Sequence, residues 1–491
     1  MTSSHIDAVV VGSGPNGLAA AITLARAGIA VTVLDAADEV GATLRSRDSS
    51  VTGIVHDVGP AVHPLAAVSP FLATLPLAEH GLAWRRPDVD VAHPLDGGRS
   101  GVLLRSIDDT AAGLAGDGDA WRRTFAPLVA RFDEISGDIA GSLRRVPERP
   151  VTLARFGLRA LRPATVLARR FRTDAARALF AGIAAHQVQP LHHLGTSAVA
   201  STLIAAGHRV GWPVAARSAQ AVTDALVGVL GDLGVKVETG VRLAAVDELA
   251  GMGTGLVLFD MSPRTVVEIV GDRLPVPVRR ALARVRPGPQ AQGIDLVVEG
   301  GLPWSVPQCR RAGTVHLGGE LEEVARVEAQ VHRGRMPERP FVVVTQPALG
   351  DPRRAVGGLQ PVAARARVPA GYAGDPTTAI LGQIERFAPG ARERIVAVEP
   401  TVPGTADGAA SGVDDVGQAL FRSRLARDPY GLGVTGMYLC SAVTAPGGGV
   451  HGLCGHNAAR QALRDHGIPA EPAGGAEDAG ATPPGGTAAL A

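Results

Sequence analysis

Lysine and tyrosine are almost missing from this chain of 491 residues. Lys236 is the single lysine, so arginine supplies nearly all of the 48 basic side chains. Aromatic residues make up 3% of the sequence, and only Tyr372, Tyr430 and Tyr438 are tyrosines. A chemistry that requires a catalytic lysine or a pair of tyrosines therefore has very few positions available.

Cysteine and excess charge are also scarce. The three cysteines, Cys309, Cys440 and Cys454, form no Cys-x-x-Cys pair, which excludes a disulfide framework and a cysteine-rich zinc site. The 48 basic residues are balanced by 47 acidic ones, so the chain lacks the surplus that a dedicated nucleic-acid binder uses against phosphates. We expect no metal and no nucleic-acid partner.

No apolar run is long and uninterrupted enough for a transmembrane helix, and the first residues lack the positive charge of a signal peptide. We expect a cytoplasmic protein. Hydrophobic residues make up 46% of the chain, which is enough for the cores of at least two domains.

The N-terminal residues predict a βαβ unit with a parallel sheet. The strand Ile6–Val11 leads through a glycine turn into a helix over Leu18–Ala27, and a second strand, Ile29–Leu34, ends at Asp35. An acid about 20 residues beyond such a turn accepts the ribose hydroxyls of a dinucleotide.

The turn itself reads Gly12-x-Gly14-x-x-Gly17. The first glycine permits the tight turn, the second lets the backbone approach a pyrophosphate, and the third lets the helix pack on the strand. The helix N-terminus supplies free N–H groups and a favourable dipole to the phosphates.

Later segments predict further helices and strands, and the Rossmann-like pattern of the N-terminal residues resumes far along the chain. Residues 65–206 read as an inserted, largely helical region, and strand and helix signals alternate over residues 279–403. The predicted helices are Ala215–Leu233, Leu321–His332 and a last one ending near Asp465. The predicted strands are Val235–Glu238, Val241–Val246, Leu256–Asp260, Ile294–Val298, Gly313–Leu317, Pro340–Gln346 and Met437–Val443.

A second glycine-rich turn, Gly447–Gly452, lies between the last strand and the last helix. It is placed to contact an anion or a flavin at the helix N-terminus. One dinucleotide turn near the N-terminus and one glycine-rich helix entry near the C-terminus indicate a single extended cofactor that reaches both.

These motifs resemble the phytoene desaturase-like FAD-dependent oxidoreductases, close to the pyridine nucleotide-disulfide oxidoreductase domain-containing protein 2 group. The resemblance runs to about Gly467. The matching stretches are Val9–Gly17, His56–Pro64, Gly211–Pro213, Thr314–Gly319, Arg335–Pro340, Tyr438–Ser441 and Pro446–Gly452.

The resemblance implies an α/β fold in which a Rossmann-like FAD-binding domain, of the glutathione reductase/amine oxidase-like type, is interleaved with an α+β substrate domain. On this basis we assign residues 1–64, 207–285 and 404–467 to the FAD-binding domain. Residues 65–206 and 286–403 form the substrate domain, and residues 468–491 a disordered tail.

The resemblance also implies which residues hold FAD. The glycine turn and the start of its helix hold the pyrophosphate, Asp35 the ribose, and later segments the adenine and the flavin ring. Ala42 stands where the family usually has a glycine. The expected FAD-binding residues are Gly12, Gly14, Pro15, Asn16, Gly17, Asp35, Ala36, Gly41, Ala42, Arg45, Ser46, Val237, Gly448, Gly449 and Val450.

The expected reaction is hydride transfer between flavin N5 and a C–H or C=C bond of a lipophilic, isoprenoid- or polyene-like molecule. The electron acceptor stays unassigned, with oxygen and a quinone as the candidates. No catalytic acid or base is assigned beyond the candidates His63 and His451, for which a structural role is the alternative. The oligomeric state stays open.

Three other functions remain open. A flavin-dependent amine oxidase resembles this class, but that resemblance implies a lysine near N5 and an aromatic cage. A redox-neutral flavin isomerase differs only in its product. Rab GDP-dissociation inhibitors resemble the fold and carry prenyl groups without redox chemistry, although the intact glycine turn and Asp35 argue against a lost cofactor.

An arginine-rich segment, Ala154–Arg177, alternates apolar residues with seven arginines. It is compatible with peripheral docking on an anionic membrane, from which a lipophilic substrate is taken. The alternative is a solvated helix face over a hydrophobic core.

Overall fold

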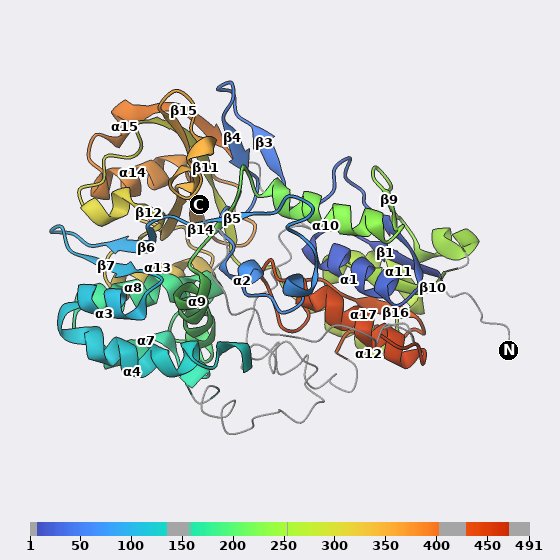
Figure 1. Cartoon of the computed structure of the whole chain (residues 1–491). Coiled ribbons are helices and arrows are strands. Elements are labelled where there is room, and N and C mark those ends of the chain that lie inside the picture. Colours follow the sequence, from blue (N-terminus) through green and yellow to red (C-terminus); the bar gives the residue numbers. More distant parts are fainter. Residues whose placement is uncertain (1–6, 135–156, 158, 253, 402–428, 471–491) are drawn as a thin grey trace, which may run out of the picture.

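Two β-sheets organise the chain (Figure 1). The structure is a computed structural model that describes residues 7–134, 157, 159–252, 254–401 and 429–470. The predicted tail, residues 468–491, lies outside the described residues from 471 onward. One sheet is parallel and five-stranded and the other is mixed and seven-stranded, so the predicted α/β class is confirmed.

The parallel sheet has the strand order β16-β10-β1-β2-β9. Its strands are β1 (Asp7–Val11), β2 (Ala30–Leu34), β9 (Lys236–Glu238), β10 (Thr254–Phe259) and β16 (Met437–Leu439). Because parallel strands end at the same edge, the loops after β1, β2, β10 and β16 meet there, which is where ligands of open α/β sheets bind.

Both faces of the parallel sheet are covered. Ala8 and Val10 of β1 share one apolar cluster with three helices, and Val9 and Val11 share another with α11. This double burial explains why β1 reads as an unbroken apolar run. The covering helices are α1 (Pro15–Arg26), α10 (Gln220–Asp232), α17 (Leu453–Asp465) and α11 (Pro263–Val270).

The mixed sheet has the order β15-β11-β14-β13-β12-β6-β7, in which only β12 and β6 run parallel. Its strands are β6 (Val89–Pro94), β7 (Ser100–Leu103), β11 (Gln290–Glu299), β12 (Ala312–Leu317), β13 (Val342–Thr345), β14 (Leu359–Val368) and β15 (Ile395–Pro400).

Helices cover this sheet on both faces, and Figure 1 shows most of them gathered on the side where α3, α4 and α9 lie. One face packs on α14 (Thr377–Phe387). The other packs on α4 (Gly118–Val129), α8 (Asp174–Ala184), α9 (Thr196–Val210) and α13 (Leu321–His332). The short helices are α2 (Pro64–Ala67), α3 (Ile107–Gly113), α7 (Ala164–Leu167), α12 (Val276–Ala283) and α15 (Ala391–Arg394). No helix among the described residues has both the length and the apolar character needed to span a bilayer.

One predicted strand is wrong. Val241–Val246 forms no strand: β9 is already the sheet edge, and a 3₁₀ helix begins at Val246. The apolar spacing there arises because Leu243 and Val246 pack on the sheet face. The described part of residues 65–206 consists mostly of helices, as predicted, and also supplies strands β6 and β7 to the mixed sheet. All six residues of β6 are buried, which removes the alternation typical of a strand.

Two small two-stranded antiparallel sheets complete the fold: the hairpin of β3 (Ser46–Asp48) with β4 (Val55–Asp57), and the pairing of β5 (Trp84–Arg85) with the distant β8 (Val214–Ala215). The helix predicted from Ala215 begins only at Gln220, because residues 214–215 form β8.

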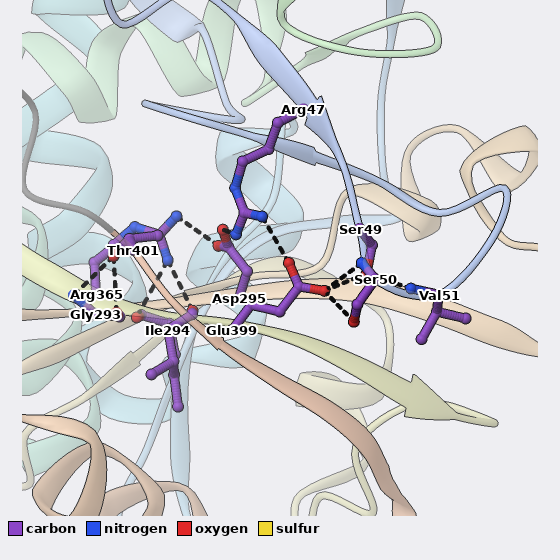
Figure 2. A network of polar contacts seen from close by, with 11 residues as sticks. Arg47, Ser49, Ser50, Val51, Gly293, Ile294, Asp295, Arg365, Glu399 and Thr401 are labelled. Atoms are coloured by element: carbon purple, nitrogen blue, oxygen red, sulfur yellow. Dashed lines mark hydrogen bonds and ion pairs between the residues drawn. The ribbon is translucent and has the colours of Figure 1, made fainter.

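The hairpin β3–β4 is tied to the mixed sheet by charge (Figure 2). Arg47 of β3 donates to Glu399 of β15 at 2.6 Å and to Asp295 of β11 at 2.8 Å. Asp295 also accepts from Arg365 of β14 at 2.6 Å, and Glu399 accepts from the Ser49 hydroxyl at 2.6 Å. The pKa of Glu399 is held at about 2 by these hydrogen bonds against its partial burial.

Candidate functional site

The glycine turn after β1 is shaped by close contacts that a side chain would break. The N–H of Gly12 donates to Leu34 O at 2.7 Å, and its φ of +105° favours glycine. A Cβ at Gly17 would lie 2.0 Å from Gly12 O. The third glycine therefore does let the helix pack against the turn.

Asp35 ends β2 directly beside this turn. Its Oδ2 accepts from the N–H of Ser13 at 2.7 Å and from the Ser13 hydroxyl, and its Oδ1 accepts from the N–H of Ala37 at 2.8 Å. The carboxylate is half-buried, and Ala36 beside it is exposed. Each carboxylate oxygen has a second lone pair, so Asp35 can accept ribose hydroxyls while keeping these bonds.

The segment after Asp35 folds back onto the turn. The N–H of Gly41 donates to Ser13 O at 3.1 Å, and a Cβ at Gly41 would lie 2.6 Å from Thr223 Oγ1. Ala42, where the family has a glycine, takes a left-handed φ of +51°. Arg45 Nε donates to Ala42 O at 2.8 Å, which holds that conformation.

Ser46 and Val237 lie on either side of this segment. The Ser46 hydroxyl donates to Asp57 Oδ1 at 2.9 Å and accepts from the N–H of Gln220 at 3.2 Å. Val237 of β9 pairs with Val33 of β2, so it lies next to the end of the strand that carries Asp35. Val237 thus lies on the side of the site that carries Asp35.

The second glycine turn meets the first. Gly448 and Gly449 are exposed, and Gly449 has a φ of +143°. The helix α17, which begins directly after this turn, packs so closely on the start of α1 that a Cβ at Gly455 would lie 1.7 Å from Asn16 O. Two segments about 435 residues apart in the sequence thus form one surface at the edge of the parallel sheet.

The two candidate histidines differ in their hydrogen bonding. Nδ1 of His451 accepts from the N–H of Leu453 at 3.0 Å, and the ring also bonds to the backbone of Gly447, so His451 stabilises the turn. His63 is buried, and neither of its ring nitrogens has a partner among the described residues. Burial lowers the pKa of both to about 4, so both rings are neutral at pH 7.

Other buried polar atoms at this edge fit a bound polar ligand. Asn16 Oδ1, at the start of α1, and Ser441 Oγ, just after β16, have no hydrogen-bond partner within the described part of the chain. Buried polar atoms are normally paired, so these positions are suited to a dinucleotide. The residues present therefore fit the FAD that the sequence predicts.

Sequence reasoning gave no role to Asp260, which follows β10 at the same edge. Its Oδ2 accepts from the N–H of Gly17 at 2.8 Å. Burial, together with the nearby Asp35, raises its pKa to about 7. The available signal was an acid at the carboxyl end of a strand neighbouring β1.

Buried ionisable groups are frequent elsewhere in the described structure. Burial lowers the pKa of six histidines well below its usual value: His63, His93, His186, His316, His451 and His456. Burial raises the pKa of three acids, to about 6 for Asp90 and about 7 for Asp260 and Glu328. We call these the buried histidines and the buried acids; His186, His456 and Asp260 among them are half-buried by solvent exposure.

The residues that amine chemistry would need lie elsewhere or are engaged. Lys236, in the edge strand β9, has a side chain 71% exposed and pairs with Glu238 at 2.5 Å. The hydroxyl of Tyr430 donates to Ala445 O at 3.0 Å, and that of Tyr438 donates to Asp465 at 3.1 Å. The cysteines Cys309, Cys440 and Cys454 are buried, as expected of small apolar residues.

Comparison with known proteins supports the fold. Residues 10–75 match a family described as NAD(P)-binding Rossmann-like domain. No curated protein matches the chain by sequence.

Solved structures of oxidases are similar over almost the whole chain. Putrescine oxidase bound to putrescine has 18% identity and a TM-score of 0.60, with 94% of this chain and 98% of that chain covered. Cyclohexylamine oxidase from Brevibacterium oxydans has 14% identity and a TM-score of 0.57, with 94% and 98% covered. An oxidoreductase from Methanosarcina mazei has 15% identity and a TM-score of 0.57, with 94% and 100% covered. At such identities the likeness establishes the fold, which is that of the predicted amine oxidase-like type.

Proposed function

We propose that this chain is an FAD-dependent oxidoreductase that transfers a hydride between flavin N5 and a C–H or C=C bond of a lipophilic, isoprenoid- or polyene-like molecule. The observation that carries the proposal is the direct packing of α17 on α1, which brings the two glycine turns together. A dinucleotide with a ring system at its far end is long enough to use both turns.

The residues divide the work of holding FAD. The amides at the start of α1 bind the pyrophosphate, and Asp35 accepts the ribose hydroxyls. Bound in this way, FAD supplies hydride acceptance and donation at N5. The turn at Gly448–Val450 and the N-terminus of α17 stabilise negative charge at the pyrimidine edge. His63 offers one N–H donor and one acceptor nitrogen to a bound group.

Amine oxidation is the second candidate, because putrescine oxidase and cyclohexylamine oxidase share the fold. The exposed, ion-paired side chain of Lys236 and the engaged hydroxyls of Tyr430 and Tyr438 argue against it. The lipophilic substrate is therefore preferred.

We also propose the domain division stated above. All strands of the parallel sheet come from residues 1–64, 207–285 and 404–467, and those of the mixed sheet from 65–206 and 286–403. Each sheet has its own apolar clusters, as expected of separate domains.

Peripheral contact with a membrane is part of the proposal. Three exposed apolar side chains lie near one another: Leu161 (58% exposed), Val166 (40%) and Leu194 (62%). Backbone hydrogen bonds hold the loop after Pro190 against residues 161–165. Residues 157–172 contain no acidic side chain. The exposed patch consists of these three residues with the exposed Arg162, Arg169, Arg170 and Arg172; such a surface suits an anionic bilayer. Residues 154–156 and 158 of the predicted segment lie outside the described residues.

The test starts with the visible spectrum of the purified protein. Flavin absorption bands are expected, and a colourless protein that ignores added FAD would refute the proposal and favour a carrier. Anaerobic titration with isoprenoids, polyenes and amines then identifies the substrate class by bleaching of the flavin. Bleaching by amines alone would establish the second candidate, and a rearranged product without net oxidation would establish an isomerase. Reoxidation by oxygen or by a quinone identifies the acceptor.

A further inference from the structure

The side chain of Asp260 lies directly on the glycine turn. Its Oδ2 accepts from the N–H of Gly17 at 2.8 Å, and its backbone N–H donates to Val11 O at 2.8 Å. A Cβ at Gly14 would lie 2.6 Å from this same oxygen, and a Cβ at Gly17 would lie 3.2 Å from the Asp260 Cβ. Glycine at positions 14 and 17 therefore also makes room for this carboxyl group.

In this position an ionised carboxylate would compete with a bound phosphate for the N-terminus of α1. The first turn of α1 offers N–H groups that attract anions, and the Asp260 carboxylate already uses one of them. A pyrophosphate at this helix end adds further negative charge within the same small region. Two anions at one helix terminus repel each other, whereas a neutral carboxyl group does not.

We propose that the protonation state of Asp260 controls the affinity for FAD: the neutral carboxyl admits the pyrophosphate, and the ionised carboxylate competes with it for the amides of α1. The proposal rests on the proposed function, because it requires FAD at this turn. In this proposal Asp260 affects only the binding of FAD, so it is a binding residue and takes no part in hydride transfer.

The surroundings of Asp260 place its titration near pH 7. Desolvation of its half-buried carboxyl group and the Asp35 carboxylate at the end of β2 together raise its pKa to about 7, against the opposing hydrogen bond from the Gly17 N–H. From β16 it faces the Cys440 thiol, whose own pKa is raised well above its usual range. The turn and the first residues of α1, Gly12–Leu18, carry no ionisable side chain. Among the described residues, no cation contributes to the shift at Asp260.

The sign of the pH dependence follows from linkage. Binding of FAD favours protonated Asp260, so the pKa of Asp260 rises in the complex. Affinity is then constant below the pKa of the free protein, about 7, and falls as the pH rises above it. If one proton is taken up on binding, the dissociation constant rises up to tenfold per pH unit above that value.

The experiment measures the dissociation constant of FAD by quenching of flavin fluorescence between pH 6 and 8.5. Wild type is expected to bind tightest at pH 6, about twofold more weakly at pH 7 and progressively more weakly above. Asp260→Asn, which keeps the shape and removes the charge, is expected to bind with a nearly flat pH profile, at least as tightly as wild type at pH 6. His63 and His451, with pKa values near 4, do not titrate in this range.

Asp35→Asn is the matched control. It removes the other carboxylate at the turn while Asp260 remains, so FAD should bind more weakly at every pH. The rise of the dissociation constant with pH should persist, and it should begin at lower pH because Asp35 no longer raises the pKa of Asp260. Asp260→Ser provides a second neutral variant, and circular dichroism verifies that each variant is folded.

A flat wild-type profile would overturn the role of Asp260 while leaving FAD binding intact, and so would a slope in Asp260→Asn and Asp260→Ser as steep as that of wild type. Weaker binding by both neutral variants at pH 6 would overturn it as well, because the carboxyl would then be required. Absence of FAD binding by wild type at every pH would refute the proposed function itself and the role of Asp260 with it.

Discussion

Removal of the Arg354 guanidinium is expected to destabilise the chain more than loss of any exposed arginine. Arg354 Nη1 donates to Asp57 Oδ2 at 2.6 Å, and both side chains are 2% exposed. Arg354 Nη2 also donates to Ala215 O at 3.1 Å. In Arg354→Met the Asp57 carboxylate stays buried without its counter-ion, a change that typically costs 3–5 kcal/mol.

The expected loss in the free energy of unfolding of Arg354→Met lies near the middle of that range. Asp57 keeps two other hydrogen bonds, from the Ser46 hydroxyl at 2.9 Å and from the N–H of Ala219 at 2.7 Å, which soften the loss. The orphaned Ala215 carbonyl adds about 1 kcal/mol. We expect about 4 kcal/mol, which lowers the urea midpoint by about 1 M if the m-value is about 3–4 kcal/mol/M. Because Asp57 also positions Ser46, FAD affinity should fall.

Three comparisons make the test specific. Asp57→Asn combined with Arg354→Met removes the isolated charge and should recover about half of the loss. Arg47→Met should cost about 1–2 kcal/mol, because Arg47 is 37% exposed and Asp295 keeps its bond to Arg365 (Figure 2). Arg264→Met, from a pair whose arginine is 88% exposed, should cost less than about 0.5 kcal/mol. If Arg354→Met shifts the midpoint no further than Arg264→Met, the buried pair does not stabilise the fold.

Three further outcomes are expected. Gly17→Ala, which places a Cβ 2.0 Å from Gly12 O, should abolish FAD binding, seen as a colourless protein; retention of flavin would contradict the tight turn. Near pH 5 the unfolded chain protonates the six buried histidines, which stay neutral in the folded chain, whereas only the folded chain protonates the three buried acids. The unfolded chain therefore binds about three more protons, and the free energy of unfolding should fall by about 4 kcal/mol per pH unit as the pH decreases from about 6. A urea midpoint unchanged between pH 7 and 5 would be inconsistent with those pKa shifts. Replacement of Leu161, Val166 and Leu194 by serine should weaken co-sedimentation with anionic liposomes, and wild-type binding should fall at high salt; equal sedimentation of variant and wild type would exclude the exposed patch as the docking surface.

The sequence predicts the parallel sheet well, because local chemistry specifies its start. The turn Gly12–Gly17, the helix after it and the acid at Asp35 all agree with the structure, and α13 has the predicted bounds. The strand β6 was missed because full burial removes the alternation that distinguishes a strand, and β7 alternates over only four residues. Register and order of the mixed sheet depend on contacts between distant segments, which no local pattern records.

Asp260 shows why part of the site stays hidden in a sequence. The strand that it ends was predicted, but its role depends on β10 lying next to β1, a neighbour about 245 residues earlier. The same holds for the pair Asp57 and Arg354, which are about 300 residues apart. The role of an isolated charged residue can be assigned only once the topology shows which residues lie next to it.

Likeness in fold to amine oxidases does not by itself carry amine chemistry to this chain. A scaffold fixes where a ring system and a substrate meet, whereas the substrate is selected by the side chains at that place. Here the single lysine, Lys236, lies on an edge strand with most of its side chain in solvent, and the buried tyrosines Tyr430 and Tyr438 have their hydroxyls bonded to the protein. Besides Asn16 Oδ1 and Ser441 Oγ, the neutral ring of His63 is buried and still able to bond a ligand. A neutral imidazole neither pairs with a cationic amine nor repels an apolar chain, so the chemistry at this position agrees better with an uncharged, lipophilic substrate than with a polyamine.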